Sequence, residues 1–448
     1  MEAILEKINT FVWGIPALVG ILGVGIYLTI RTGFVQVRLF PEALRRFADM
    51  FRGRDRSSFR SLCTALGATV GTGNLVGVAG AIALGGPGSI FWMWVCGILG
   101  MATKYAEAVL AVHYRVRERG EVLGGPMYYI SRGMGSRWNW LASLYCFFGV
   151  IAAFGVGNAT QINAMVTGIR QVTGAVGEKG NLLLGTGLAL LVGLLLQGGA
   201  GGIGRTAEKL VPLAAVGYMG LCVLVLILRA DRIGPALLAI FQGAFAPKAV
   251  TGGLLGSAFG ALRVGCARGV FTNEAGMGTA GIAHGSAEVA HPARQGMMGI
   301  MEVFLDTIVI CTLTALVILV SGVPIPYGSD AGGSLTLEAF GAVCGAWAQV
   351  FLTASICCFA LATVLGWGLY GLRCVRFLLG QGSERWFVWL QMGAALLGTV
   401  MQTGVIWLLA ETVNGLMAIP NLVALTILSG KVTQLTKQYT NLKNTVAN

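Results

Sequence analysis

The chain consists of long apolar runs separated by short polar segments. A hydrocarbon core of roughly 30 Å needs about 20 apolar residues in a helix. Eleven runs have about this length, at 11–30, 61–84, 89–112, 140–168, 182–198, 207–228, 250–271, 297–322, 347–371, 386–409 and 411–430. The stretch 235–247 is also apolar, and it is either half of a broken seventh span or an interfacial helix before it; we adopt the interfacial interpretation. The pattern predicts an all-α polytopic membrane protein with about 11 transmembrane helices.

Basic residues gather in alternate loops. Of the 31 Lys and Arg residues, 24 fall in one set of loops, six fall in the other set, and Lys104 lies inside the third run. Loops rich in Lys and Arg stay on the cytoplasmic side. The count assigns Arg263, Arg268 and Arg294 to one cytoplasmic loop, and it places 323–346, which has no Lys or Arg, outside. We therefore expect a cell-membrane protein with an extracellular N-terminus and a cytoplasmic C-terminus.

An odd number of spans permits one extra helix followed by two five-helix units of opposite orientation. This division gives an N-terminal part with the extra helix and a basic loop (1–60), a first unit (61–230), a second, inverted unit (231–430) and a cytoplasmic tail (431–448). Inverted repeats of this kind are typical of secondary transporters. The hydropathy pattern permits the division, and no clear internal sequence repeat accompanies it.

Composition excludes several classes of function. With 55% apolar and 11% charged residues, the chain has less than half the charge of an ordinary soluble protein, which argues against a water-soluble enzyme. The net charge of +12 is spread over many loops rather than one face, which argues against nucleic-acid binding. The ten cysteines and three histidines show neither C-x-x-C nor H-x-x-x-H spacing. We expect no transition-metal site and no cofactor.

The second run contains an interruption, Gly67-Ala68-Thr69-Val70-Gly71-Thr72-Gly73-Asn74, near the middle of the bilayer. Each interior glycine costs about 1 kcal/mol of helix stability relative to alanine. Unwound backbone at this depth is tolerated only where it is buried in protein or lines a cavity. Free N–H groups there suit a carboxylate, and free carbonyls suit Na⁺. The alternative is a glycine seam for helix packing, although the cluster of polar groups favours binding.

A second glycine-rich stretch, 251–260, occupies the corresponding place in the seventh run. It is the expected counterpart of the first interruption. Ordinary helix packing explains it about as well, and the position of the break inside it cannot be read from the residues.

Polar residues in other spans are candidates for binding, because a polar group inside the bilayer is costly without a partner. A spacing of three puts Asn158 and Gln161 on one helical face, with Asn163 nearby. Gln161 either contacts a substrate or joins two helices. Thr363 and Trp367 lie at i and i+4, where they suit a cation and the wall of a small pocket. The alternative is a threonine bonded to its own helix beside a core tryptophan.

Ionisable residues inside the runs are few. Lys104 and Glu107 are spaced for an ion pair. Glu302 and Asp306 share one helical face; they either carry protons or pair with Arg263 or Arg268, and we expect the arginine pairing. A channel would require rings of polar residues, and a membrane enzyme would require a nucleophile or a base beside the acids. Neither pattern is present, so we expect a transporter that is not an enzyme.

Several long motifs resemble the alanine or glycine:cation symporters, also called sodium:alanine symporters. They are GATVGTGNLVGVAGAI (67–82), GGPGSIFWMWVCGILGMATKYAEAVLAVHYR (85–115), GGPMYYI (124–130), ARGVFTNEAGMGTAGIAH (267–284), HPARQG (291–296) and LATVLGWGLYG (361–371). The resemblance spans nearly the whole chain and is weakest in 170–245 and the C-terminal tail.

This resemblance implies a LeuT-type fold of inverted five-helix repeats that moves a small neutral amino acid, alanine or glycine, with Na⁺. Proton coupling, or a preference for glutamine or serine, is the alternative. The implied substrate contacts are Thr72, Gly73, Asn74, Gln161, Thr363 and Trp367. The implied cation ligands are Ala68, Gly71 and Thr363. The expected partners are the amino acid, Na⁺ and the lipid bilayer, with no obligatory protein partner.

Overall fold

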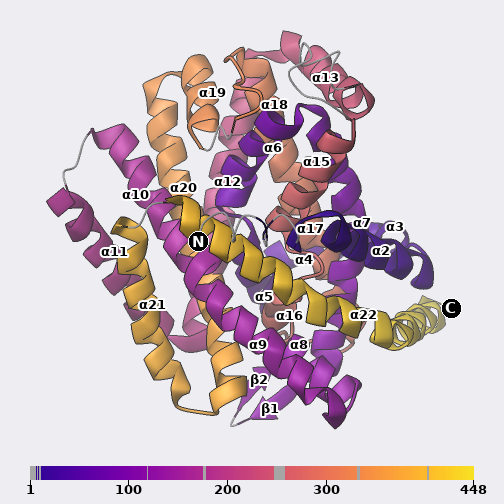
Figure 1. Ribbon diagram of the computed structural model, residues 1–448. Coiled ribbons are helices and arrows are strands. Elements are labelled where there is room, and N and C mark those ends of the chain that lie inside the picture. The colour runs from indigo at the N-terminus through magenta and orange to yellow at the C-terminus, as the bar shows by residue number, and fades with distance from the viewer. Residues whose placement is uncertain are drawn as a thin grey trace.

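The computed structural model describes residues 7, 9, 12–118, 120–174, 178–246, 258–329, 333–400 and 403–447. This part of the chain is almost entirely helical (Figure 1). Its two strands, β1 (Val116–Glu118) and β2 (Glu121–Leu123), pair as a short antiparallel hairpin. Seven described helical segments are long and apolar enough to cross a membrane, and a bent helix pair makes an eighth.

The N-terminal half begins with α2 (Ile15–Arg31), α3 (Val35–Arg38) and α4 (Phe40–Phe51). Span 2 follows as α5 (Arg56–Thr69), the π-turn η1 (Gly73–Gly77) and α6 (Val78–Gly85). Asp55 caps the start of α5 by accepting a hydrogen bond from the Ser58 N–H at 3.1 Å. The remaining elements are α7 (Gly88–His113), the hairpin, α8 (Pro126–Tyr128), η2 (Tyr129–Gly133), η3 (Ser136–Trp138), α9 (Asn139–Phe154), η4 (Gly155–Ala159), α10 (Thr160–Thr173), α11 (Glu178–Gln197) and α12 (Gly199–Leu228).

The C-terminal half begins with two short elements, η5 (Ala230–Arg232) and α13 (Ile233–Phe245). It continues with α15 (Ala258–Asn273), α16 (Thr279–His284), α17 (Pro292–Val303), η6 (Phe304–Cys311), α18 (Thr312–Ser321), α19 (Ser334–Cys344), α20 (Ala346–Leu379), α21 (Ser383–Val400) and α22 (Thr403–Ala447). In Figure 1, α13 and α19 lie at the end of the molecule opposite the β1–β2 hairpin. The loop 323–346, which contains α19, and the hairpin thus lie at opposite ends of the molecule.

Two groups of helices meet at the centre of the molecule. In the first group, the mostly buried α7 packs against α15, α16 and α17. In the second group, α20 packs against α9 and α10, while α11 packs against α21. Span 2 contacts both groups, through α6 with α15 and through α5 with α20. Its interruption therefore lies between the two groups.

Eight of the predicted spans correspond to helical segments that satisfy the length and hydropathy of a membrane span. The other three contain α2, α15 and α21, which have 17, 16 and 18 residues and are shorter or less apolar than the rest. The presence of seven or eight apolar spans is thus observed in the described part, and the count of eleven stays a prediction. The predicted helix at 235–247 is present as α13, and its interfacial position stays a prediction.

The seventh span contains a break that the sequence analysis did not predict. Residues 251–257 lie outside the described residues, and from Ala258 the chain is one continuous helix, α15, as far as Asn273. The observed break is the turn 274–278, after which α16 begins at Thr279. Arg263 and Arg268 are therefore helix residues rather than loop residues, and the side of the membrane on which they lie stays a prediction.

Candidate functional site

The interruption predicted in span 2 is present. The α-helix ends at Thr69, and Val70 has an extended conformation with φ −75° and ψ 95°. The chain becomes helical again from Thr72, and α5 and the second half of the span differ in direction by 51°. The Gly71 N–H donates to Asn74 Oδ1 at 3.0 Å, so an amide side chain replaces the carbonyl that a continuous helix would supply. The first N–H groups of the second half have no intrahelical partner.

Gly71 is the point where span 2 meets two other helices. A Cβ added at Gly71 would lie 2.6 Å from Thr363 Oγ1 and 3.6 Å from Gln161 Oε1. The single hydroxyl hydrogen of Thr363 is shared between the Gly67 carbonyl, 3.0 Å from Oγ1, and the Phe359 carbonyl of its own helix, at 3.1 Å. Thr363 is therefore bonded to its own helix, as the alternative interpretation had it, and also to the end of α5, while its role at a cation site stays a prediction.

Gln161 joins two helices in this structure. Its Oε1 accepts from Thr72 Oγ1 at 3.3 Å, and its Nε2 donates to the Val156 carbonyl at 3.1 Å. Asn158 points elsewhere, because its Nδ2 donates to the Gln391 carbonyl of α21 at 2.8 Å. The π-turn η4 precedes α10 and changes the register, so the prediction that both amides share one face was wrong.

Trp367 is completely buried against η4. A Cβ added at Gly157 would lie 2.3 Å from Trp367 Cβ, so only glycine permits this approach. The indole Nε1–H donates to Glu274 Oε1 at 3.0 Å. Glu274 follows α15 directly and is a non-glycine residue with φ +53°. The Trp367 indole, which the sequence analysis offered as the wall of a pocket, is thus hydrogen-bonded to the first residue of the second break.

Glu107 of α7 holds the second break in place. Its Oε1 accepts from the N–H groups of Gly276 and Gly278 at 2.9 and 3.0 Å, and from Asn421 Nδ2 at 2.8 Å. Gly276 and Gly278 have φ of +94° and +79°, a conformation that favours glycine. A carboxylate of the protein itself therefore occupies the N–H groups of this break.

The two breaks lie close together. A Cβ added at Gly73 would lie 3.6 Å from Thr272 Cα, just before the second break. Asn74 fixes the first break from the other side, because its Nδ2 donates to Asp306 Oδ1 at 2.7 Å. The other oxygen of Asp306 accepts from Thr307 Oγ1 at 2.8 Å.

Two predicted ion pairs were wrong. Lys104 pairs with Glu302 at 2.9 Å instead of with Glu107, and both side chains are buried. Glu302 also accepts from His284 Nε2 at 2.8 Å, so its cationic partner is Lys104 rather than Arg263 or Arg268. Helical spacing selected Glu107, but the adjacent helix supplies the carboxylate that reaches the lysine. Asp306 accepts from amide and hydroxyl groups, as described above.

The predicted site residues mostly converge. Gly71, Thr72, Gln161 and Thr363 meet at the first break, and Ala68 packs closely on Gly366 of α20. Gly73 and Asn74 begin η1 between this break and the second one, and Trp367 lies one helical turn from Thr363. Their roles in binding stay predictions.

Sequence reasoning missed four contributors to this region: the Gly67 carbonyl, Glu107 as a ligand of the second break, Glu274, and the contact between Asp306 and Asn74. Glu274 lies in the motif TNEAGMG, where an acid followed by two glycines inside an apolar region was the available signal. The other contacts join segments far apart in the chain and have no local signature.

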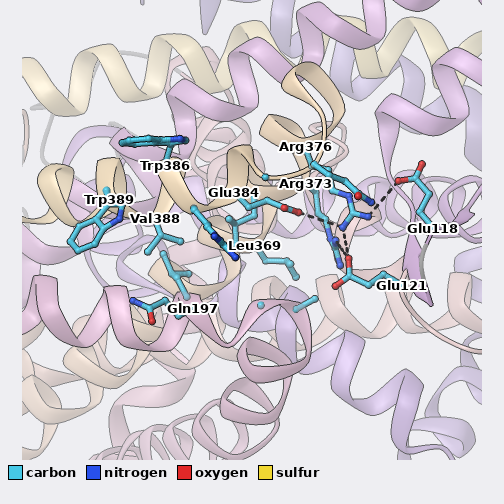
Figure 2. A pocket seen from close by; sticks show the side chains of 17 residues that line it. Glu118, Glu121, Gln197, Leu369, Arg373, Arg376, Glu384, Trp386, Val388 and Trp389 are labelled. Carbon is cyan, nitrogen blue, oxygen red and sulfur yellow. Dashed lines mark hydrogen bonds and ion pairs between the residues drawn. The ribbon is translucent and has the colours of Figure 1, made fainter.

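A pocket in the described part of the chain lies away from these residues. It has a volume of about 1120 Å³ between α11, α20, α21 and the hairpin, and none of the predicted site residues lines it (Figure 2). There Arg373 donates to Glu121 Oε2 at 2.8 Å, and Arg376 contacts both Glu121 and Glu118. Although partial burial opposes the shift, these arginines hold the pKa of Glu121 below its ordinary value. The cluster ties the hairpin to α20.

A smaller pocket of about 220 Å³ lies nearer to the first break. Its lining residues are Asn9, Trp13, Leu84, Arg263, Val264, Ala267, Arg268 and Phe271. A Cβ added at Gly73 would lie 3.8 Å from Phe271 Cδ1. Phe271 therefore separates this pocket from the first break.

In the described part of the chain, no group of His, Cys, Asp and Glu is arranged to hold a metal ion. All ten cysteines are free thiols, and each is buried or partly buried. These observations agree with a packing role for the cysteines.

Comparisons with known proteins agree with the sequence motifs. The model of the sodium:alanine symporter family matches residues 1–448. The sodium/alanine symporter AgcS of Methanococcus maripaludis is 40% identical over 99% of this chain and 98% of its own. The probable sodium/glutamine symporter GlnT of Bacillus subtilis is 36% identical over 99% of this chain and 92% of its own.

The fold is similar to that of MhsT in its crystal structure with L-phenylalanine. The TM-score is 0.57, the identity is 14%, and the match covers 86% of this chain and 98% of MhsT. At this identity the likeness concerns the fold alone. It agrees with the LeuT-type helical architecture that the motifs implied.

Proposed function

Because the chain belongs to the sodium:alanine symporter family, an amino-acid and cation symporter family of multi-pass membrane proteins, we propose that it carries alanine or glycine into the cell with Na⁺. The observation that carries this proposal is the pair of adjacent helix breaks, of which only one has its N–H groups occupied by a carboxylate of the protein. The first break is then the binding position for the substrate.

The difference between the breaks supports a place for the substrate carboxylate. At the second break, Glu107 accepts from the N–H groups of Gly276 and Gly278. At the first break, the resident partner of Gly71 N–H is the neutral amide of Asn74. The N–H groups of Thr72 and Gly73 begin a half-helix, where the helix dipole favours an anion. We assign the substrate carboxylate to Thr72 and Gly73, with Gln161 and Asn74 as further polar contacts.

The cation site is proposed at the end of α5. Thr363 Oγ1 and the Gly67 carbonyl lie 3.0 Å apart, and a Cβ added at Gly71 would lie 2.6 Å from the same hydroxyl. Carbonyl and hydroxyl oxygens are hard donors that suit Na⁺. We propose Na⁺ coordination by Thr363 together with backbone oxygens of Ala68 and Gly71, and we add the Gly67 carbonyl to this set.

Trp367 is proposed to limit the size of the substrate. Its ring is fixed between Gly157 and Glu274, and it lies one helical turn from Thr363. A rigid ring beside the site excludes larger side chains by steric overlap. Alanine and glycine fit this arrangement better than branched amino acids.

Transport is proposed to follow alternating access between two inverted five-helix units, 61–230 and 231–430, within eleven spans. A broken helix near the start of each unit, in α5–α6 and in α15–α16, supports this division. The pocket of about 220 Å³ lined by Phe271 is then the approach from outside. The N-terminus is extracellular and the C-terminus is cytoplasmic in this arrangement.

Proton coupling and a glutamine preference are the second candidates. The described interior contains the buried acids Glu107, Glu274, Glu302 and Asp306 but one buried lysine, Lys104, so protons are a possible alternative to Na⁺. The similarity to GlnT favours testing glutamine and serine beside alanine.

Uptake of labelled alanine into proteoliposomes tests the proposal. We expect uptake with an inward Na⁺ gradient and competition by glycine. Li⁺ and H⁺ gradients are compared in the same preparation, and liposomes without protein are the control. Uptake that persists without Na⁺ and collapses with the pH gradient would overturn Na⁺ coupling, and stronger competition by glutamine than by alanine would change the substrate.

A further inference from the structure

Glu274 is a buried acid with two defined hydrogen-bond partners. Its side chain accepts from Trp367 Nε1 through Oε1 at 3.0 Å and from Thr279 Oγ1 through Oε2 at 2.6 Å. Glu274 is 3% exposed and Trp367 is 0% exposed, so water does not compete for either bond. A hydrogen bond to a charged acceptor in such surroundings is stronger than a neutral one.

The indole of Trp367 is held from several sides. Gly157 allows the ring to lie directly against η4, and Tyr370 contacts it edge-on with ring centroids 5.7 Å apart. These contacts enclose the ring but have no directional preference of their own. The bond from Nε1–H to Glu274 supplies the direction, because an indole has a single donor.

The position of Glu274 is fixed in turn by the second break. Its φ of +53° is unusual for a residue with a side chain, and the Thr279 hydroxyl at the start of α16 holds its other oxygen. The bond to Trp367 therefore joins α20 to the broken helix α15–α16. These elements belong to the two groups of helices that meet at the centre of the molecule.

We propose that Glu274 is the positioning residue for Trp367: its carboxylate orients the indole beside the amino-acid site and thereby sets the size limit for the substrate. This inference rests on the proposed function, since it assigns a cause to the selectivity of the same site. Orientation requires an acceptor at this position and does not require a negative charge. The carbonyl oxygen of glutamine would serve the same purpose.

The transport experiment compares four variants in proteoliposomes, with uptake normalised to inserted protein. We expect Glu274→Ala to raise the potency of leucine relative to alanine as a competitor by roughly tenfold, as expected for losing one hydrogen bond to a charged acceptor. Glu274→Gln is expected to retain the wild-type rank order. Trp367→Phe, which keeps a ring but removes the donor, is expected to resemble Glu274→Ala. The double variant Glu274→Ala, Trp367→Phe is expected to show no further change beyond Trp367→Phe.

Two controls separate positioning from general damage. The Glu274→Ala and Glu274→Gln variants both have a side chain on the same strained backbone. The difference between the two variants therefore reports the hydrogen-bonding group alone. Glu288→Ala changes an acid whose side chain is 65% exposed and is expected to leave the rank order unchanged. If Glu274→Ala retains the wild-type order, or if its effect multiplies with that of Trp367→Phe, the positioning role is wrong. If Glu274→Gln loses selectivity as Glu274→Ala does, the charge matters and the positioning role is also wrong.

A second measurement does not depend on transport. With ¹⁵N-labelled tryptophan, the ten indole N–H groups give separate signals, and Trp367→Phe identifies one by its loss. We expect this signal to move strongly in Glu274→Ala and weakly in Glu274→Gln. An unmoved signal in Glu274→Ala would show that the bond is absent. If the signal moves but wild-type protein does not transport alanine, the proposed function fails while the contact stands.

Discussion

Gly71→Ala tests the contact between the first break and the proposed cation site. The added Cβ would lie 2.6 Å from Thr363 Oγ1, closer than real Cβ contacts allow. The hydroxyl cannot move away freely, because its one hydrogen is shared between the carbonyls of Gly67 and Phe359 at 3.0 and 3.1 Å. Threonine is also stiff at χ1, since its Cβ is branched. Either the hydroxyl loses its bond to α5, or the break shifts.

The expected cost is that of overpacking, about 1–3 kcal/mol. If this cost falls on the cation-bound state, the Na⁺ concentration for half-maximal alanine uptake rises by about 5- to 150-fold. The assay is alanine uptake into proteoliposomes over a range of Na⁺ concentrations. Inserted protein is quantified for each variant, so that folding losses do not mimic weaker Na⁺ binding.

Gly77→Ala is the matched control in the same span. A Cβ added there meets nothing within 4 Å, so we expect its Na⁺ dependence to equal that of wild type. In a Thr363→Ala background the Oγ1 clash is absent, and Gly71→Ala should add little. If Gly71→Ala and Gly77→Ala need the same Na⁺ concentration for half-maximal alanine uptake, the reasoning is refuted. The close contact at Gly71 would then have no effect on cation binding.

The remaining predictions concern other parts of the structure. Gly73→Leu should abolish labelled-alanine binding while leaving an inserted protein, whereas Gly73→Ala should retain binding because its Cβ meets only ordinary contacts; wild-type affinity in the leucine variant would contradict this. Trp367→Ala should widen the competitor range toward leucine and weaken alanine by about 1–3 kcal/mol; an unaltered rank order in uptake competition would oppose it. Lys104→Met should lower the melting temperature in detergent, because Glu302 is then buried without its cation at a cost of about 3–5 kcal/mol, and Glu302→Gln in the same chain should recover part of the loss. Because the pKa of Glu121 is lowered in the folded protein, its carboxylate stabilises the folded state at pH values above the ordinary carboxyl pKa. This contribution disappears as the pH falls through the folded pKa. From neutral to acidic pH, the melting temperature of Glu121→Gln should therefore fall less steeply than that of wild type.

The first break could be predicted from sequence because its cause is local. Glycines at 67, 71 and 73 weaken the helix, and the neighbouring polar groups of Thr72 and Asn74 supply bonds for an unwound chain. The structure shows the break at the predicted residues. The contact from Thr363 to Gly67 spans 296 residues and has no local signature. The family resemblance named Thr363 together with Ala68 and Gly71 but not the Gly67 carbonyl.

The second break could not be found in the same way, because its cause lies on another helix. Glycine density is as high in 251–260, where a break was expected and most residues lie outside the described part, as in 274–278, where a break is observed. The chain leaves the helix at Glu274 because Glu107, 169 residues before Gly276, accepts two N–H groups there. Composition cannot distinguish a glycine that packs from one that opens the helix toward a distant carboxylate.

The prediction for Lys104 was wrong for the same reason, because its partner lies on another helix. The observed pairing also accounts for the difference between the two breaks. Helical spacing predicts a pair with Glu107, but a buried lysine is stabilised by whichever carboxylate has its remaining bonds satisfied. Glu302 meets that condition, because Lys104 and His284 bind its two oxygens. Glu107 is then available to the N–H groups of the second break. The pairing of Lys104 with Glu302 leaves Glu107 at the second break and only the neutral amide of Asn74 at the first break. This difference is what the proposed binding of an amino-acid carboxylate at the first break needs.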